Sequence, residues 1–233
     1  MNVLASWPAV RLLPLQRAPA TGLLLHEIFA SIQGESTYAG RPCTFIRTTA
    51  CNLRCSYCDT RHAFTEGEPW QLPAVLARVE ALGLPLVEIT GGEPLLQPLV
   101  LPLMVQLCER GYEVLLETSG SLDVGEVDPR VIKIMDLKAP SSREVGANRM
   151  ANLDLLTPRD EVKFVLGDRT DYVWARELTK DWNLSARCTV LMGTVHGVLS
   201  NAELAAWIVA DRLPVRMQVQ MHKVIWDAER RGV

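Results

Sequence analysis

The sequence predicts an α/β fold built on a parallel sheet, and two observations lead to this prediction. From Gly22 onward, short apolar runs rich in β-branched residues alternate with segments of helical periodicity. The chain has 233 residues and shows neither an internal repeat nor a linker, so one domain accommodates it. Such alternation is typical of parallel strands joined by crossover helices, either doubly wound or curved into a barrel.

Seven apolar runs are the predicted strands of this sheet, because each is five to seven residues long and bounded by polar or turn-forming residues. In chain order they are 43–47 (CTFIR), 86–90 (LVEIT), 112–118 (YEVLLET), 131–137 (VIKIMDL), 161–166 (EVKFVL), 189–195 (TVLMGTV) and 215–221 (VRMQVQM).

Two of the intervening helices have clear boundary signals. Apolar residues recur at helical spacing over 72–82, and Gly83 is a natural C-terminal cap. Ser200 and Glu203 form a capping box, which predicts that a second helix begins there. The apolar residues that would face the sheet from this second helix are Leu204, Trp207 and Ile208.

Composition indicates a folded protein and argues against two classes of partner. Hydrophobic residues make up 48% and charged residues 22% of the chain, which is ordinary for a globular domain. The net charge is -3 and the basic residues form no stripe, so we expect no nucleic-acid binding. The uncharged stretch 94–108 is shorter than a bilayer span and contains Pro98 and Pro102, so we expect no membrane helix.

Residues 1–21 are expected to be an N-terminal extension, for which disorder is one expectation, and 22–233 a single domain. The apolar runs of the extension are broken by Pro8 and Pro14, and Arg17 follows the leucines, unlike a signal peptide. Without an export signal, the six cysteines are expected to be thiols or metal ligands in the reducing cytoplasm.

Three cysteines are concentrated in the segment CNLRCSYCDT. Cys51, Cys55 and Cys58 follow the predicted strand 43–47, at the end of a parallel strand where α/β folds bind ligands. Three thiolates can hold three irons of a 4Fe–4S cluster and leave the fourth iron free to chelate the amino and carboxylate groups of S-adenosylmethionine. One electron then cleaves a carbon–sulfur bond of the sulfonium and gives a deoxyadenosyl radical. The alternative is structural zinc completed by Cys108, Cys188 or His62.

This segment resembles the CxxxCxxC signature of the radical S-adenosylmethionine superfamily, including the aromatic Tyr57 before the last cysteine. ITGGEP at 89–94 resembles the superfamily element whose backbone meets the methionine amino group, which implies that role for Gly91, Gly92 and Glu93. Cys43, Cys108 and Cys188 lie outside the signature and are expected to be buried small apolar residues.

Several motifs together resemble one family of that superfamily, the 7-carboxy-7-deazaguanine synthases. They occur in the family's order: EIFASIQGES, FIRTTACNLRCSYCDT, ITGGEP, ETSG, MDLKAPSS, EVKFVL and VQMHK. The resemblance implies a partial, incomplete TIM-like barrel of the radical SAM type, modified with fewer helices. It also implies a lyase of queuosine or deazapurine biosynthesis that, with Mg²⁺, converts 6-carboxy-5,6,7,8-tetrahydropterin to 7-carboxy-7-deazaguanine by radical ring contraction and loss of ammonia.

A carboxylated pterin requires a cation for its carboxylate and paired hydrogen-bonding groups for its aminopyrimidinone edge. Arg47 supplies the cation from within a predicted strand, and Gln33 and Glu35 alternate along an extended segment. Ser36 departs from the glycine that is usual after this motif. The substrate contacts implied by the resemblance are Ile32, Gln33, Gly34, Glu35, Arg47, Thr90 and His222.

The resemblance also implies the residues that bind the cofactor and the metal ion. Thr60 is the implied Mg²⁺ ligand, because its hydroxyl oxygen is a hard donor. The implied S-adenosylmethionine contacts are Tyr57, Cys58, Asp59, Gly91, Gly92, Glu93, Glu117, Ser119, Asp136, Leu137, Lys138, Met192, Gly193, Thr194 and Val195. For the last four, only backbone contacts are implied, since Gly193-Thr194 departs from the usual Ser-Pro.

The partners implied by the family are an electron donor such as flavodoxin and a second copy of the chain. Some relatives end soon after the VQMHK motif and use the terminal carboxylate as a substrate contact, whereas this chain continues to Val233. The rival enzyme class is a radical activase that forms a glycyl radical on a partner protein. That activity calls for an open groove, whereas Arg47, Gln33 and Glu35 favour a small anionic heterocycle.

Overall fold

The computed structural model of the chain describes residues 7–227 and 230–233. Within these residues the strands are β1 (Gly22–Ile32), β2 (Pro42–Thr48), β3 (Glu68–Gln71), β4 (Leu86–Gly91), β5 (Glu113–Thr118), β6 (Ile132–Asp136), β7 (Glu161–Leu166), β8 (Thr189–Thr194) and β9 (Arg216–Met217). The α-helices are α1 (Ala9–Leu12), α2 (Leu72–Leu82), α3 (Val100–Glu109), α4 (Arg169–Asp181), α5 (Leu184–Arg187), α6 (Asn201–Asp211) and α7 (His222–Ile225).

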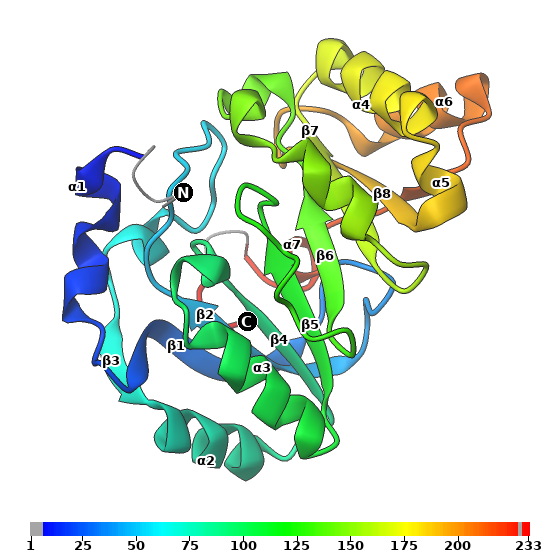
Figure 1. Cartoon of the computed structure of the whole chain (residues 1–233). Coiled ribbons are helices and arrows are strands. Elements are labelled where there is room, and N and C mark those ends of the chain that lie inside the picture. The colour runs from blue at the N-terminus through cyan, green and yellow to red at the C-terminus, as the bar shows by residue number, and fades with distance from the viewer. Residues whose placement is uncertain (1–6, 228–229) are drawn as a thin grey trace.

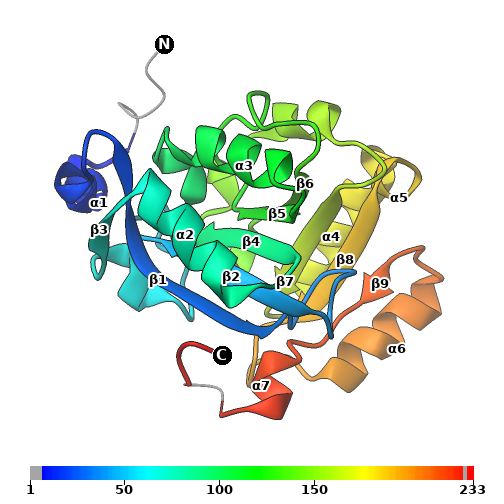
Figure 2. The ribbon, with the colours of Figure 1, turned by 90° about the horizontal axis from the view of Figure 1, so that it is seen from below.

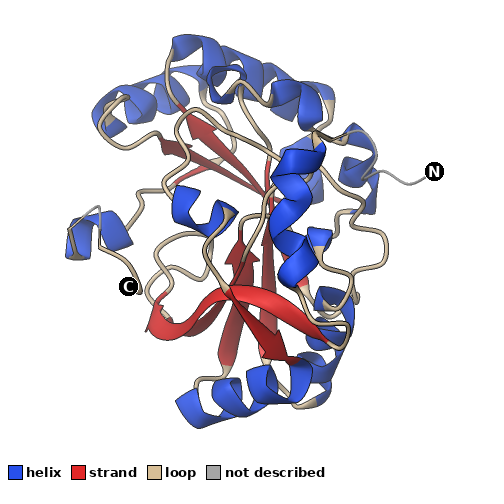
Figure 3. Cartoon of the chain, turned by 90° about the vertical axis from the view of Figure 1, so that its left-hand side faces the viewer, coloured by secondary structure: helices blue, strands red, loops and turns tan. Residues whose placement is uncertain are grey.

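The strands form one sheet in the order β3-β1-β2-β4-β5-β6-β7-β8-β9 (Figure 1). From β2 to β9 all neighbours are parallel, and these seven strands are the seven that the apolar runs predict. The prediction of a parallel α/β sheet is therefore confirmed. Because β3 and β9 are its two edges, the sheet is a partial barrel, with most helices on its outside (Figure 3).

Two strands at one edge are antiparallel and were not predicted. β1 pairs with both β2 and β3, and its register with β2 shifts between Leu25 and Glu27. This bulge at His26 interrupts the alternation of inward and outward side chains. Leu23, Leu24 and Leu25 are consecutive and all fully buried. A search for alternating apolar and polar residues therefore does not find this strand.

Both helices with boundary signals form where they are expected. Helix α2 ends at Gly83, whose φ of 67° lies in the left-handed region that favours glycine. Helix α6 follows Ser200, whose hydroxyl accepts a hydrogen bond from the Ala202 amide at 3.2 Å. Leu204 is buried, while Trp207 and Ile208 are half-buried against the second apolar cluster.

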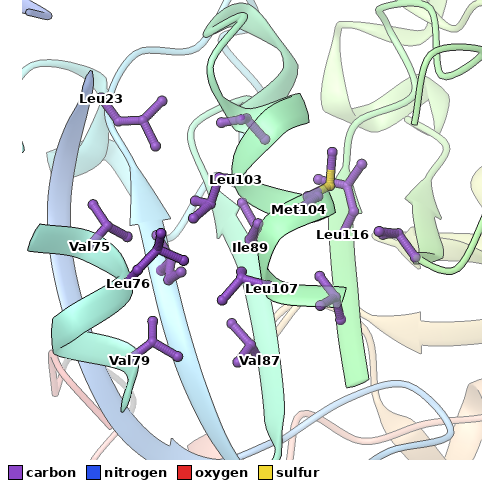
Figure 4. Packing of buried hydrophobic residues seen from close by; sticks show 14 of the residues in the cluster. Leu23, Val75, Leu76, Val79, Val87, Ile89, Leu103, Met104, Leu107 and Leu116 are labelled. Atoms are coloured by element: carbon purple, nitrogen blue, oxygen red, sulfur yellow. The ribbon is translucent and has the colours of Figure 1, made fainter. Parts of the chain in front are cut away.

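The outer face of the sheet has an apolar core between the strands and helices α2 and α3. Val75 and Val79 of α2 and Leu103 and Leu107 of α3 pack on this face, as Figure 4 shows. A second outer cluster joins β6, β7 and β8 to α4, α5 and α6. The alternation of side chains along each strand produces this outer core: Val87 and Ile89 of β4 belong to the first cluster, and Val162 and Phe164 of β7 to the second.

The inner face changes character along the strands. At the amino ends of the strands, Cys43, Leu86, Leu115 and Ile132 form a small buried apolar cluster. Toward the carboxyl ends the inward residues are polar or charged, and α7 lies on this side, opposite α2 and α3 (Figure 2). The inner face is therefore closed by apolar packing at one end and polar at the other.

The described part of the predicted extension contains α1 and a 3-10 helix, Leu13–Arg17, rather than a disordered segment. Arg11 donates to the Asn52 carbonyl at 2.6 Å and contacts the Glu144 carboxylate at 3.2 Å. The extension thus packs against the start of the cysteine segment. None of the helices within the described ranges combines the length and apolar character needed to cross a membrane.

Candidate active site

A cavity of about 610 Å³ lies at the carboxyl ends of the parallel strands. Its volume is in the range of small-molecule and cofactor sites. Gly91 of β4, Glu117 of β5, Asp136 of β6 and Lys163 of β7 line it, and Val195 follows β8. The structure therefore brings the polar ends of the strands together around one space, as expected for a barrel-like α/β fold.

The cysteine segment crosses one side of this cavity, and all three of its cysteines line it as free thiols. Hydrogen bonds fix the segment to residues that follow β6. The Arg54 amide donates to the Glu144 carboxylate at 2.6 Å, and the Ser56 amide donates to the Ser142 carbonyl at 3.0 Å. These hydrogen bonds fix the backbone that carries the three cysteines, which keeps their sulfur atoms in defined positions.

The two glycines at the end of β4 allow close contact with the start of the cysteine segment. Gly91 has φ 133°, and a Cβ on Gly92 would lie 2.0 Å from the Ala50 carbonyl oxygen. The Gly92 and Glu93 amides donate to the carbonyls of Thr48 and Ala50 at 3.1 and 2.9 Å. Any side chain on Gly92 would push these backbones apart, so both predicted cofactor elements depend on this contact.

Glu93 is fully buried, and its side chain does not line the cavity. Its carboxylate accepts hydrogen bonds from the Thr118 hydroxyl at 2.8 Å and the Ser119 amide at 2.8 Å. It also accepts from the Ser119 hydroxyl and the Leu95 amide. The carboxylate therefore ties the end of β5 to the Gly-Gly turn, which leaves only the Glu93 backbone to contact a cofactor.

The donor set of the cysteine segment fits an iron–sulfur cluster. Burial raises the pKa of the Cys51 thiol to about 12 and that of the Cys55 thiol to about 11. Iron ligation must displace these protons, and the Lys138 ammonium, which lowers the pKa of both thiols, favours the thiolates. Three cysteines facing one cavity therefore suit a cluster with one iron left open.

The residues proposed to complete a zinc site lie elsewhere or have other neighbours. Cys188 is buried in the second outer cluster, and Cys108 is half-buried against the first. Neither of them lines the cavity. His62 does, but its ring packs beside that of His26, with 4.6 Å between ring centroids. The zinc alternative thus loses two of its three candidate ligands.

Arg47 points into the cavity from β2, as predicted, and there it meets an anion of the protein. Its Nε lies 2.8 Å from Oε1 of Glu27, and its guanidinium lies 5.7 Å from the centroid of the Phe29 ring. Glu27 was not predicted as a site residue, although it begins the EIF motif. Because the contact uses Nε, the two terminal nitrogens of the guanidinium remain available for a ligand.

The amide of Gln33 is fixed by two partners. Its Nε2 donates to the carboxyl group of Glu88 on β4, and its Oε1 accepts from the Glu35 amide at 2.9 Å. An amide has two N–H bonds and two acceptor lone pairs, so half of this capacity remains for a ligand. Burial, followed by the charge of Glu117, raises the pKa of Glu88 well above its ordinary value, which favours the protonated form of this carboxyl group.

Lysine and carboxylate side chains form a network across the cavity floor. The Lys163 ammonium is 3.0 Å from Oε2 of Glu35 and 3.9 Å from Oδ2 of Asp136, and it also forms an ion pair with Glu117. Lys138 contacts Asp136 at 2.7 Å. Oδ1 of Asp136 is buried and has no hydrogen-bond partner among the described residues. Such an acceptor suits a hydroxyl donor of a ligand, as the ribose of S-adenosylmethionine would supply.

His222 packs directly against Gly34. A Cβ on Gly34 would lie 2.4 Å from Nδ1 of His222, so only glycine fits here. Burial lowers the pKa of His222, which leaves a neutral imidazole able both to donate and to accept a hydrogen bond.

Ser36, which departs from the family's glycine, has φ 65°. This left-handed conformation gives a physical reason for the usual glycine.

Thr60 and Asp59 place oxygen ligands at the rim of the cavity. The Thr60 hydroxyl donates to Oδ1 of Asp59 at 3.0 Å, and the Lys223 ammonium lies 2.6 Å from Oδ2. Burial tends to raise the pKa of Asp59, but Lys223 outweighs it and lowers the pKa to about 2. Hydroxyl and carboxylate oxygens are the donors that Mg²⁺ prefers, so the donor type here fits the prediction for Thr60.

Most of the predicted site residues line this one cavity, together with the cysteines of the cluster motif. The exceptions are Glu93, Leu137, Met192, Gly193 and Thr194. Leu137 and Met192 are buried in the second outer cluster, and the Thr194 hydroxyl donates to Asn201 at 2.8 Å. Their side chains therefore point away from the cavity.

Several residues that line the cavity were not predicted. Glu88 and Lys163 lie in predicted strands, where period-two alternation places them opposite outward apolar residues, and this signal could have found them. The end of the chain also lines the cavity, through Arg230, Arg231, Gly232 and Val233. No sequence pattern indicated that residues after α7 return to the site.

A model of the radical SAM superfamily matches residues 45–198. The chain is 46% identical over 214 residues to a 7-carboxy-7-deazaguanine synthase of Chlorobaculum tepidum, with 91% of this chain and 97% of the relative covered. It is 45% identical over 222 residues to a protein of the same name from Koribacter versatilis, with 89% and 98% covered.

Among solved structures, that of QueE from Escherichia coli resembles the chain with a TM-score of 0.70 and 24% identity, covering 90% of this chain and 98% of that one. A likeness at this identity concerns the fold. From the sequence matches, the chain belongs to the 7-carboxy-7-deazaguanine synthase family of the radical SAM superfamily.

Proposed function

We propose that the protein converts 6-carboxy-5,6,7,8-tetrahydropterin to 7-carboxy-7-deazaguanine by radical ring contraction with loss of ammonia. The observation that carries this proposal is the sharing of one cavity by three thiols of a cluster motif, the guanidinium of Arg47 and the carboxyl–amide set of Gln33 and Glu35. The relatives that bear the name of this synthase support it over most of the chain.

In this proposal the cysteines hold a 4Fe–4S cluster, which when bound supplies one electron to S-adenosylmethionine. Cys51, Cys55 and Cys58 are its ligands. S-adenosylmethionine would lie between the cysteine segment and the strand ends, against Tyr57 to Asp59, the backbone of Gly91 and Gly92, Glu117, Ser119, Asp136, Lys138 and Val195. The other predicted contacts, Glu93, Leu137 and Met192 to Thr194, do not line the cavity. The free oxygen Oδ1 of Asp136 supports this placement.

The substrate would occupy the part of the cavity nearest β1 and β2. Arg47 would bind its carboxylate through the terminal nitrogens that Glu27 does not use, and Thr60 would hold the Mg²⁺, which would supply further positive charge for the substrate. Ile32 to Glu35 and Thr90 contact the aminopyrimidinone edge, and His222 contacts it with a neutral imidazole. These groups converge on a cavity of about 610 Å³, a size that favours a small heterocycle over the polypeptide of an activase.

The reaction requires a reductant and a compartment in which thiols persist. We propose flavodoxin, or a protein of that kind, as the electron donor, the cytoplasm as the location, and a homodimer as the assembled form. All six cysteines are free thiols in the structure, which is compatible with a reducing compartment.

Anaerobic turnover of the reconstituted protein tests the proposed function. The protein is incubated with reductant, S-adenosylmethionine, Mg²⁺ and 6-carboxy-5,6,7,8-tetrahydropterin, and the products are analysed by mass spectrometry. We expect 7-carboxy-7-deazaguanine and ammonia, and neither with Cys55→Ala protein. Cleavage of S-adenosylmethionine without a deazaguanine product would contradict the proposal and favour the activase.

A further inference from the structure

Lys163 is a buried cation that lines the cavity. It is the third residue of β7, and its side chain is only 5% exposed. Its neighbours Val162 and Phe164 point the other way, into the second outer cluster. Alternation along β7 thus directs the ammonium group inward, where burial has an energetic cost unless carboxylates compensate it.

The compensating carboxylates come from three distant segments of the chain. Glu35 follows β1, and its Oε2 lies 3.0 Å from Nζ of Lys163. Glu117, the residue before the last in β5, forms an ion pair with the same nitrogen, and Asp136 at the end of β6 lies 3.9 Å away. One ammonium group therefore links the loop after β1 to two strand ends across the sheet.

The effect of Lys163 on Glu117 is large. Burial alone raises the pKa of Glu117, but the adjacent Lys163 outweighs burial and lowers the pKa to about 2. Glu88, which is also buried on this floor, forms no ion pair with Lys163, and its pKa is raised. The carboxylates of Glu35 and Glu117 are thus paired with the cation, whereas no ion pair offsets the burial of Glu88.

We propose that Lys163 is a positioning residue that couples the substrate subsite to the S-adenosylmethionine subsite, by holding Glu35 and Glu117 on one ammonium group. This inference rests on the proposed function, which assigns Glu35 to the pterin and Glu117 to the cofactor. A ligand that orders either carboxylate then also orders the cation that holds the other. Binding of one ligand should therefore favour binding of the second, with a reciprocal effect.

The chain contains a matched control for a purely structural role. Lys133 on the neighbouring strand β6 is also buried, with a side-chain exposure of 6%, and its Nζ lies 3.0 Å from Oδ2 of Asp160. This pair does not line the cavity. Lys133→Met and Lys163→Met each remove a buried cation and leave a buried carboxylate unpaired, so both should lower stability.

The test measures binding of both ligands to anaerobic, cluster-containing, unreduced protein by isothermal titration calorimetry. S-adenosylmethionine is titrated with and without saturating 6-carboxy-5,6,7,8-tetrahydropterin, and the reverse titration is also made. Parent, Lys163→Met, Lys163→Arg and Lys133→Met proteins are compared after thermal melting has shown that each is folded. Product formation by the parent is measured in the same preparation.

In the parent we expect the pterin to tighten binding of S-adenosylmethionine by at least about fivefold, the lower end of typical coupling between sites. Lys163→Met should weaken the binding of both ligands and abolish the coupling between them. Lys163→Arg should retain part of this coupling, and Lys133→Met should leave it intact. If Lys163→Met keeps the parent's coupling, or if a product-forming parent shows no coupling, the inference is wrong and the proposed function stands. A parent that neither binds the pterin nor forms product overturns both.

Discussion

The two faces of the sheet are built from the same strands but solve different problems. On the outer face, residues such as Ile89 and Leu116 pack against helices in an apolar core. On the inner face, their neighbours Glu88, which is buried, and Glu117, which is half-buried, carry ionisable groups that hydrogen bonds and Lys163 compensate. The outer face therefore stabilises the fold. The inner face buries polar groups at a cost in folding free energy, which is expected of a ligand site.

The sharpest way to separate the faces is to compare cysteines on each. Cys55→Ala removes a thiol that lines the cavity, and we expect loss of bound iron and of detectable deazaguanine formation. Cys188→Ala removes a thiol of the second outer cluster and should retain both. Iron content, the visible absorbance of the cluster and product mass spectrometry check the pair. Iron loss in Cys188→Ala with retention in Cys55→Ala would reverse the assignment.

Truncation on the outer face should affect stability without affecting the site. Leu103 of α3 is fully buried in the first cluster, so Leu103→Ala should lower the free energy of unfolding by about 2–5 kcal/mol. Urea unfolding measures this change, and steady-state kinetics of the variant should give an unchanged KM for the pterin. An altered KM with unchanged stability would show that the two faces are not separable in this way.

Glu93 should affect both the fold and the site, because its buried carboxylate holds the Gly-Gly turn beside the cavity to the end of β5. Glu93→Ala leaves the Ser119 and Leu95 amides without their acceptor and should cost about 1–3 kcal/mol of stability. Since the turn then moves against the cysteine segment, affinity for S-adenosylmethionine should also fall. Calorimetry measures the affinity and urea unfolding measures the stability. A loss of stability with unchanged affinity would show that Glu93 serves the fold alone.

The smallest expected effect is a gain in stability from Glu88→Gln. The folded-state pKa of Glu88 is raised above its ordinary value of 4.5, so the folded protein keeps a proton that the unfolded chain releases. Stability from this group is therefore full below pH 4.5 and is lost as pH rises toward the raised pKa. Glu88→Gln keeps an acceptor for Gln33 but avoids this loss.

The advantage of Glu88→Gln should grow with pH by at most about 1.4 kcal/mol per unit in that window. Urea unfolding at pH 5, 6, 7 and 8 measures it. A difference between variant and parent that does not change with pH would show that Glu88 is ionised in the folded state.

The strand pattern and the cysteine motif predicted the parallel sheet and the cavity wall, because both signals are local in sequence. Strand β1 was not predicted, because the extra residue of the bulge at His26 shifts the alternation that identifies a strand. The ion pair of Arg47 with Glu27 and the network around Lys163 depend on contacts between segments far apart in the chain. Residue spacing cannot specify such contacts, although alternation along a strand indicates which residues point inward.

The proposed chemistry requires that the three cysteines of this cavity hold a 4Fe–4S cluster with one iron open to S-adenosylmethionine. Electron paramagnetic resonance of the reduced, oxygen-free protein, recorded before and after addition of S-adenosylmethionine, tests it most directly. We expect a cluster signal whose g values shift on addition of S-adenosylmethionine. A protein that contains zinc in place of iron, or a cluster signal that does not respond to S-adenosylmethionine, would contradict it.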